Sequence, residues 1–131
     1  MGKQETNLAH GIKISVKTKY SEENSIPEQN HFLFTYQIEI ENTSEFTVQL
    51  LSRHWEIFDS INKHSAVDGQ GVVGEQPILD PGEIFEYVSA CSLETGLGKM
   101  SGRYTFERKI DNQRFNVNIP EFLLSVPYIL N

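Results

Sequence analysis

The sequence predicts an all-β protein, an antiparallel β-sandwich of about seven or eight short strands. Apolar side chains recur at every second position through most of the chain, which is the spacing of a strand with one buried face. Gly, Pro, Asn and Asp separate these segments, as turn residues do between strands. Several short alternating strands joined by turns are typical of two packed antiparallel sheets.

The composition limits the classes of partner. The chain has 131 residues and a formal net charge of −7, with 38% hydrophobic and 22% charged residues. We expect a single domain over residues 1–131, with an ordered core at about residues 10–127. The acidic charge argues against a phosphate-backbone ligand, so we expect no nucleic-acid partner. No apolar run approaches the ~20 residues of a membrane-spanning helix, so we expect no membrane insertion.

The amino terminus and the single cysteine indicate in which cellular compartment the protein is expected. The first residues lack the apolar core of a secretion signal, although Gly2 and Thr6 fit the loose myristoylation pattern. No polybasic run follows, so we expect a frayed polar terminus instead. Cys91 is the only cysteine and excludes an intrachain disulfide, which suits a reducing, cytoplasmic compartment.

Residues 12–20 alternate apolar side chains with lysines. Because lysines along one face discourage edge-to-edge pairing, we expect an edge strand here. The apolar face carries Ile12, Ile14, Val16 and Tyr20, and the other face carries Lys13, Lys17 and Lys19. Residues 21–30 are polar and are predicted to form a loop.

Residues 32–41 show the clearest alternation and are predicted to anchor the core. The large apolar side chains on one face are Phe32, Phe34, Tyr36, Ile38 and Ile40. Later segments follow the same rule, with the apolar sets Phe85, Tyr87 and Cys91; Met100, Tyr104 and Phe106; and Phe115, Val117 and Ile119. Pro120 then interrupts, and the pattern resumes with Phe122, Leu124 and Val126.

Residues 42–58 fit either a helix or a strand. A helix beginning at Asn42 would bring four side chains to helical spacing, namely Phe46, Leu50, His54 and Phe58. Against the helix, Thr47 and Val48 are β-branched and favour a strand. The strand requires a bulge near Leu50–Leu51, because the alternation changes phase there. We favour the strand.

A proline-glycine turn precedes one of the later strands. Residues 79–85 read Leu-Asp-Pro-Gly-Glu-Ile-Phe, in which Pro81 and Gly82 suit the centre of a type II turn. This run resembles the turn before a late strand in fibronectin type III domains. That family usually has a tyrosine where Phe85 stands, so the resemblance implies packing at this corner without the tyrosine's hydroxyl bond.

Spaced motifs over about residues 10–127 carry a closer resemblance. They are Val48-Gln-Leu-Leu-Ser-Arg-His-Trp55, Gly69-Gln-Gly-Val-Val-Gly-Glu-Gln-Pro77, Met100-Ser-Gly-Arg-Tyr104 and Ile119-Pro-Glu-Phe122. Together they resemble the ApaG family. The family's usual Thr-Pro-x-Gly-Thr-Met is replaced here by Thr95-Gly-Leu-Gly-Lys-Met100.

The resemblance carries expectations of fold and function. It implies a fibronectin type III-like or immunoglobulin-like sandwich. In bacteria it also implies a protein associated with cobalt and magnesium efflux. The same domain is similar to a non-catalytic module in some eukaryotic F-box and polymerase-interacting proteins.

The glycine-rich run at residues 69–74 is open to two interpretations. Gly69-x-Gly71-x-x-Gly74 matches the dinucleotide-binding string, but Glu75, Gln76 and Pro77 follow it where that fold requires a helix. The glycines could still form a nest of N–H groups for a phosphate or pyrophosphate, with Arg53 supplying positive charge. Alternatively, they make a tight turn and allow close approach of the backbone.

Two side chains on the strand at residues 48–58 are weak metal-ligand candidates. Alternation places His54 and Glu56 together on one face, but two ligands do not make a site. Arg53 and Trp55 fall on the opposite, core-facing side, where Trp55 is expected to be buried. Arg53 must then reach a carboxylate or the rim of the sandwich.

Two further expectations concern the partners of Arg53 and the role of Cys91. Glu75 and Glu83 are the expected carboxylates for Arg53. Cys91 lies on an inward face, so we interpret it as a buried structural thiol rather than a nucleophile.

No catalytic constellation stands out, so we expect no enzyme and no cofactor. The function predicted is a non-catalytic binding module of the ApaG type, acting through contacts with a protein partner and associated with cobalt/magnesium homeostasis. Ile61, Val72 and Val73 lie in loop-like stretches and are candidate exposed contacts. The alternative is a phosphate, pyrophosphate or nucleotide-binding protein that uses the glycine loop 69–74. A direct divalent-cation ligand is a further alternative.

Overall fold

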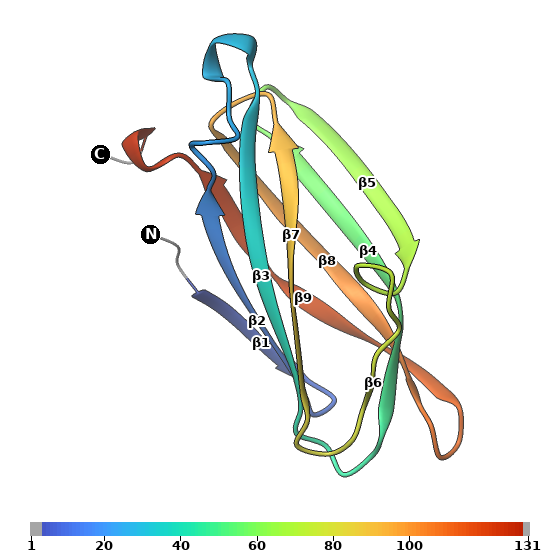
Figure 1. Cartoon of the computed structure of the whole chain (residues 1–131). Helices are drawn as coiled ribbons and strands as arrows, with labels where there is room; N and C mark the ends of the chain where they lie inside the picture. Colours follow the sequence, from blue (N-terminus) through green and yellow to red (C-terminus); the bar gives the residue numbers. More distant parts are fainter. Residues whose placement is uncertain (1–3, 130–131) are drawn as a thin grey trace.

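The computed structural model describes residues 4–129 and confirms the predicted antiparallel β-sandwich (Figure 1). The strands of the described region are β1 (Gln4–Ala9), β2 (Ile12–Tyr20), β3 (Phe32–Asn42), β4 (Val48–Asp59), β5 (Lys63–Gln70), β6 (Ile78–Leu79), β7 (Ile84–Leu93), β8 (Leu97–Arg108) and β9 (Gln113–Ser125). Two short 3-10 helices, η1 (Pro27–Gln29) and η2 (Pro127–Ile129), complete it. One sheet has the order β1-β2-β3-β7, and the other has the order β5-β4-β8-β9 with β6 also pairing with β4.

Strand β4 forms where the helix alternative was considered, and it contains the predicted bulge. Its register with β8 shifts between Leu50 and Ser52. Before the shift β4 pairs with β6, and from Ser52 onward it pairs with β5. The extra residue reverses the phase of the strand, so that Leu50 and Trp55 both point into the core although five positions separate them.

A second bulge accommodates Pro120. The sequence suggested an interruption here, but β9 continues from Gln113 to Ser125. Its register with β8 shifts between Met100 and Gly102, which places Pro120 in the irregular stretch. A proline has no N–H for the ladder, so a bulge on an outer strand is where a sheet tolerates it.

The two inner faces meet in one core, as the alternation predicted. Trp55 is buried and lies with its ring centroid 5.4 Å from that of Tyr36 and 5.9 Å from that of Phe122. The largest fully buried side chains are Tyr104, Phe34, Phe106, Ile12, Ile14, Ile38, Ile40, Leu50, Met100, Leu124, Val16 and Val48.

The expectation of an edge strand at residues 12–20 was wrong. Strand β1 pairs with β2 along its whole length and takes the outer position. The polar terminus is therefore a strand from Gln4 onward, and the Asn7 side chain donates a hydrogen bond to the Asn118 carbonyl of β9 (2.7 Å). Gly2, which fits the loose myristoylation pattern, lies outside the described residues.

Strand β5 was not predicted, because its sequence is hydrophilic. All but one of its eight residues are exposed, so neither of its faces carries an apolar stripe. The expectation that the apolar residues Ile61, Val72 and Val73 in the loops flanking β5 are exposed was partly wrong. Ile61 and Val73 are exposed, but Val72 is fully buried.

The sandwich is closed on one side and open on the other. Strands β1 and β2 pack against β9, so the outer strands of the two sheets meet there. On the opposite side β7 and β5 end their sheets, and no further strand of the described region pairs with either of them (Figure 1). None of the helices in residues 4–129 has the length and apolarity needed to cross a bilayer.

A buried asparagine holds one end of the two sheets together. Asn42 has no exposed surface, and its amide group donates to the carbonyls of Phe46 (2.8 Å) and Leu79 (2.9 Å). Its side-chain oxygen accepts hydrogen bonds from the N–H and the hydroxyl of Ser44. Every polar atom of this side chain is therefore bonded, as burial requires.

Candidate functional site

The glycine run forms a tight turn at the end of β5. Val72 N–H donates to the Glu75 carbonyl (2.8 Å), and Glu75 N–H donates to the Val72 carbonyl (2.9 Å). Val73 and Gly74, between them, both have positive φ (42° and 81°), as a type I′ turn requires. Gly71 N–H donates to the Leu51 carbonyl of β4 (2.8 Å). The N–H groups of Gly71 and Val72 in the run, and that of Glu75 after it, thus donate to main-chain carbonyls.

Arg53 braces this turn from within the sandwich. Its Nη1 donates to the carbonyls of Gln70 (3.0 Å) and Gly71 (2.8 Å). Gly69 lies directly over the guanidinium, and a Cβ there would come within 2.7 Å of the guanidinium carbon. Arg53 is therefore hydrogen-bonded as expected, but its partners are main-chain carbonyls and not the predicted carboxylates.

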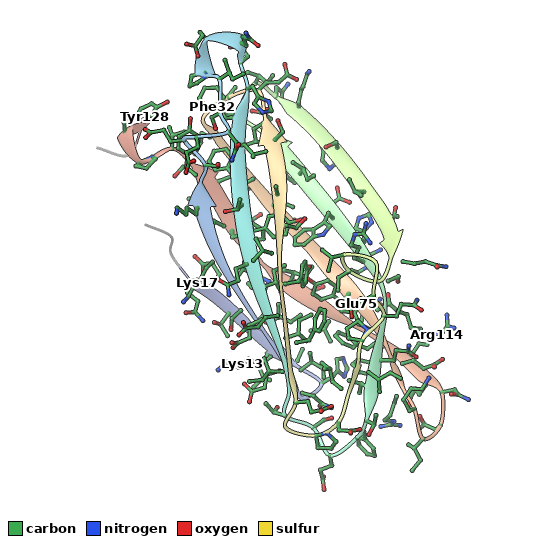
Figure 2. All side chains as sticks on the ribbon, viewed as in Figure 1. Lys13, Lys17, Phe32, Glu75, Arg114 and Tyr128 are labelled. Atoms are coloured by element: carbon green, nitrogen blue, oxygen red, sulfur yellow. The ribbon has the colours of Figure 1, made fainter. Side chains whose placement is uncertain are left out.

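The predicted carboxylate partners of Arg53 have other positions. The side chain of Glu83 accepts a hydrogen bond from Asp80 N–H (2.7 Å) at the proline-glycine turn. Glu75, labelled in Figure 2, is the exposed last residue of the glycine turn. Glu83 thus stabilises the proline-glycine turn, and Glu75 ends the glycine turn.

This geometry favours the structural interpretation of the glycines over a phosphate nest. A nest needs free N–H groups, and those of Gly71 and Val72 already have carbonyl partners. A Cβ on Gly71 would overlap the Glu75 carbonyl oxygen, and φ at Gly71 is +61°. A Gly71→Val substitution would therefore distort the turn itself.

His54 lies on the outer face of β4 and joins two carboxylates. Its Nδ1 contacts Asp68 Oδ1 of β5 (2.6 Å), and its Nε2 contacts Glu56. His64 contacts the other carboxylate oxygen of Glu56 and stacks on Phe58, with ring centroids 4.3 Å apart. Donation from both ring nitrogens requires the protonated imidazole, because a neutral ring carries one N–H.

The charges of this cluster shift the pKa values of its members. Hydrogen bonds to Asp68 and then to Glu56 raise the pKa of His54. Hydrogen bonds from His54 and then from His64 lower the pKa of Glu56. The two metal-ligand candidates are therefore paired with each other, and the described residues hold no group of three His, Cys, Asp or Glu side chains placed for a metal ion.

The phenols and the thiol in the core are held neutral. The hydroxyls of Tyr87 and Tyr104 are hydrogen-bonded to each other, and burial raises the pKa of both. Burial also raises the pKa of the Cys91 thiol to about 11. A thiol of this pKa carries almost no thiolate at neutral pH, which agrees with its interpretation as structural.

The open edge of β7 exposes main-chain groups. Asn42 donates its N–H to the Glu83 carbonyl (3.0 Å) and accepts from Gly82 N–H (2.7 Å), so its main-chain groups face the β7 side. Alternate residues of a strand face opposite neighbours, and β3 pairs with β7 without a register shift. Odd-numbered residues of β7 therefore bond to β3. The residues whose N–H and C=O point to the open edge are Ile84, Glu86, Val88, Ala90 and Ser92.

The same five residues place their side chains on the outer face of the sheet, because Phe85, Tyr87, Cys91 and Leu93 point inward. Ile84 is 51% exposed and Val88 is 59% exposed. Glu86 lies between them and directly opposite Glu39 of β3. The edge is thus a strand with two exposed β-branched residues and a carboxylate pair.

Comparison with known proteins gives a consistent family. The family model of the ApaG domain matches residues 22–108. Protein ApaG of Azoarcus sp. (strain BH72) is 44% identical over 131 residues, which is 100% of both chains. Protein ApaG of Brucella canis is 44% identical over 120 residues, 92% of each chain. A crystal structure of an ApaA protein from Bordetella pertussis is similar with a TM-score of 0.86 and 43% identity, covering 88% of this chain and 94% of that one.

Replacing Arg53 with alanine should destabilise the protein. Arg53→Ala leaves the Gln70 and Gly71 carbonyls without their donor, and we expect the free energy of unfolding to fall by about 1–3 kcal/mol. Urea denaturation followed by Trp55 fluorescence measures this, with Arg53→Lys as a control that keeps the charge. An unchanged denaturation midpoint in Arg53→Ala would show that the brace contributes nothing.

The His54–Asp68 pair should make stability depend on pH. A raised pKa in the folded state stabilises the protein below the pKa of unfolded histidine, and this contribution is lost as the pH rises through the folded pKa. Asp68→Asn should therefore destabilise at about pH 5–6 and have little effect at alkaline pH. Denaturation at a series of pH values tests this, and in a His54→Gln background the difference should vanish. A difference that is constant with pH would contradict the pairing.

Proposed function

This chain belongs to the ApaG domain family, and we propose that it is a non-catalytic binding module that acts by adding a partner strand to the open edge of β7. The observation that carries the proposal is the row of outward N–H and C=O groups on this strand, flanked by exposed Ile84 and Val88. An extended segment of a partner would complete those hydrogen bonds, and its side chains would meet the exposed apolar pair.

Comparison of the sheet edges supports the choice of β7. Natural sheets protect their edges with short strands, lysines, prolines or bulges. Strand β1 is short and lies against β9, and β9 carries Pro120 and a bulge. Strand β5 is exposed on both faces and carries Lys63, His64 and Asp68. Strand β7 has ten residues and pairs with β3 without a bulge, and it contains neither lysine nor proline.

The link to cobalt and magnesium is proposed to be indirect. The family resemblance supplies this link, and the candidate ligands His54 and Glu56 are engaged with each other and with Asp68 and His64. A module that binds a partner would influence metal homeostasis through that partner and need hold no ion itself. The proposal includes a cytoplasmic location, where the thiol of Cys91 stays reduced.

A phosphate, pyrophosphate or nucleotide ligand at residues 69–74 stays the alternative. Its support is weaker because Arg53 is turned toward two carbonyls and the N–H groups of Gly71 and Val72 are bonded. The edge of β7, in contrast, has donors and acceptors without a strand partner in the described region.

Site-specific photo-crosslinking in the source cell tests the proposed function. A photo-reactive amino acid at Val88 should give a defined protein adduct, whereas the same group at Leu8 of β1, which is similarly exposed (61%), should not. Adding Ala90→Pro removes one outward N–H without touching the ladder to β3, and should abolish the Val88 adduct. Equal adducts at both positions, no adduct at Val88, or an adduct that survives Ala90→Pro would each overturn the proposal.

A further inference from the structure

The outer face of β7 presents an acidic group between two apolar ones. Ile84, Glu86 and Val88 follow one another on this face, because every second side chain of a strand points to the same side. All three are exposed. A strand laid beside β7 would bring its own outer-face side chains directly opposite these three, at roughly 4.5–5.5 Å between Cβ atoms.

The neighbouring strand adds negative charge to this edge. Glu39 of β3 lies directly opposite Glu86, and Glu41 lies directly opposite Ile84. The pKa of Glu39 is raised, first by a side-chain hydrogen bond with Glu86, and then by burial and by the negative charges of Glu86 and Glu41. Two ionised carboxylates directly opposite each other destabilise a sheet, so a cation placed beside this pair would be stabilising.

The cations of this face lie on the far side of the carboxylates. Lys13 lies opposite Glu41 and Lys17 lies opposite Gln37, and both are on β2, beyond β3 as seen from β7 (Figure 2). Lys13 partly offsets the charge on Glu39. Lys17 lines a shallow hollow with Glu39 and Glu86 on the β2 side, whereas on its other side β7 is the last strand of the sheet and has no strand neighbour in residues 4–129.

We propose that the partner segment is a basic extended strand with the pattern apolar–x–Lys/Arg–x–apolar, whose cation pairs with Glu86 while its apolar residues cover Ile84 and Val88. This inference rests on the proposed function, because it names the chemistry of the strand that the edge of β7 accepts. The pattern reads the same in both directions, so it holds for parallel and antiparallel addition.

A second copy of β7 does not satisfy this chemistry. Antiparallel pairing about Val88 would place Ala90 of one copy opposite Glu86 of the other. Pairing about Glu86 would place the two Glu86 carboxylates opposite each other. Neither register supplies a cation, so the charge complementarity favours a different chain over self-association through this strand.

Two synthetic peptides test the charge requirement. Capped Thr-Val-Thr-Lys-Thr-Val-Thr, and the same peptide with Glu in place of Lys, would be titrated into ¹⁵N-labelled protein. We expect the Lys peptide to shift the amide signals of residues 84–92 saturably, and the Glu peptide to bind at least about tenfold more weakly. Glu86→Lys should reverse this preference. Equal binding of both peptides, or no binding of either, overturns the basic-strand inference.

A matched pair of substitutions tests strand addition itself. Val88→Pro and Val88→Ala both remove the valine side chain, but only the first removes the outward N–H. We expect the Lys peptide to bind Val88→Ala measurably and Val88→Pro much more weakly, with the dispersed amide spectrum of both variants confirming the fold. Equal binding to the two variants overturns strand addition for the peptide.

The two proposals fail in different ways. If neither peptide binds while the Val88 crosslink forms and is lost with Ala90→Pro, the partner chemistry is wrong and the binding module stands. If the crosslink is absent, the proposed function fails whatever the peptides do. Light scattering of the protein without peptide tests self-association. Dimers that are lost in Val88→Pro would assign the edge to a second copy and overturn the inference.

Discussion

The unpaired edge of β7 is the constraint on which the functional interpretation depends. Two open sheets have four outer strands, and here the β1 and β9 edges protect each other by packing together. Strand β5 carries charged side chains on both faces, which disfavour pairing with another strand. Strand β7 alone combines length, regular pairing to β3 and exposed β-branched side chains with outward main-chain groups that no described strand takes up. An open edge of this kind is a template for pairing with another strand, and the proposed function rests on this property.

The features that look most chemical in the sequence are structural in the fold. The bulge in β4 divides neighbouring residues between two environments, so that Arg53 points inward and His54 points outward. Arg53 then holds the glycine turn through carbonyls, and Gly69 permits the guanidinium to approach. His54 contacts two carboxylates of the outer face, those of Glu56 and Asp68. Each of these side chains is already hydrogen-bonded within the protein, whereas the outward main-chain groups of β7 have no strand partner in residues 4–129.

Sequence patterning predicted the parts of the fold in which one face is apolar and the other polar. This holds for β2, β3, β7, β8 and β9, and for β4 once a bulge is allowed. It failed for β1, whose half-buried face carries Glu5, Asn7 and Ala9, and for β5, which is exposed on both faces, because neither strand has an apolar period to detect. The partners of Arg53 could not be predicted, because they depend on where a turn places two carbonyls. The Glu39–Glu86 pair depends on the register between two strands separated by more than forty residues, which no local pattern encodes.

Amide hydrogen exchange along β7 tests the central claim most directly. In the free protein we expect slow exchange at Phe85, Tyr87, Ser89 and Cys91, which bond to β3, and fast exchange at Glu86, Val88, Ala90 and Ser92, which face the open edge. Binding of the partner strand should slow the second set and leave the first unchanged. Slow exchange at the second set in the free protein would show that the edge is already covered. No change on binding would show that the partner does not pair with this strand.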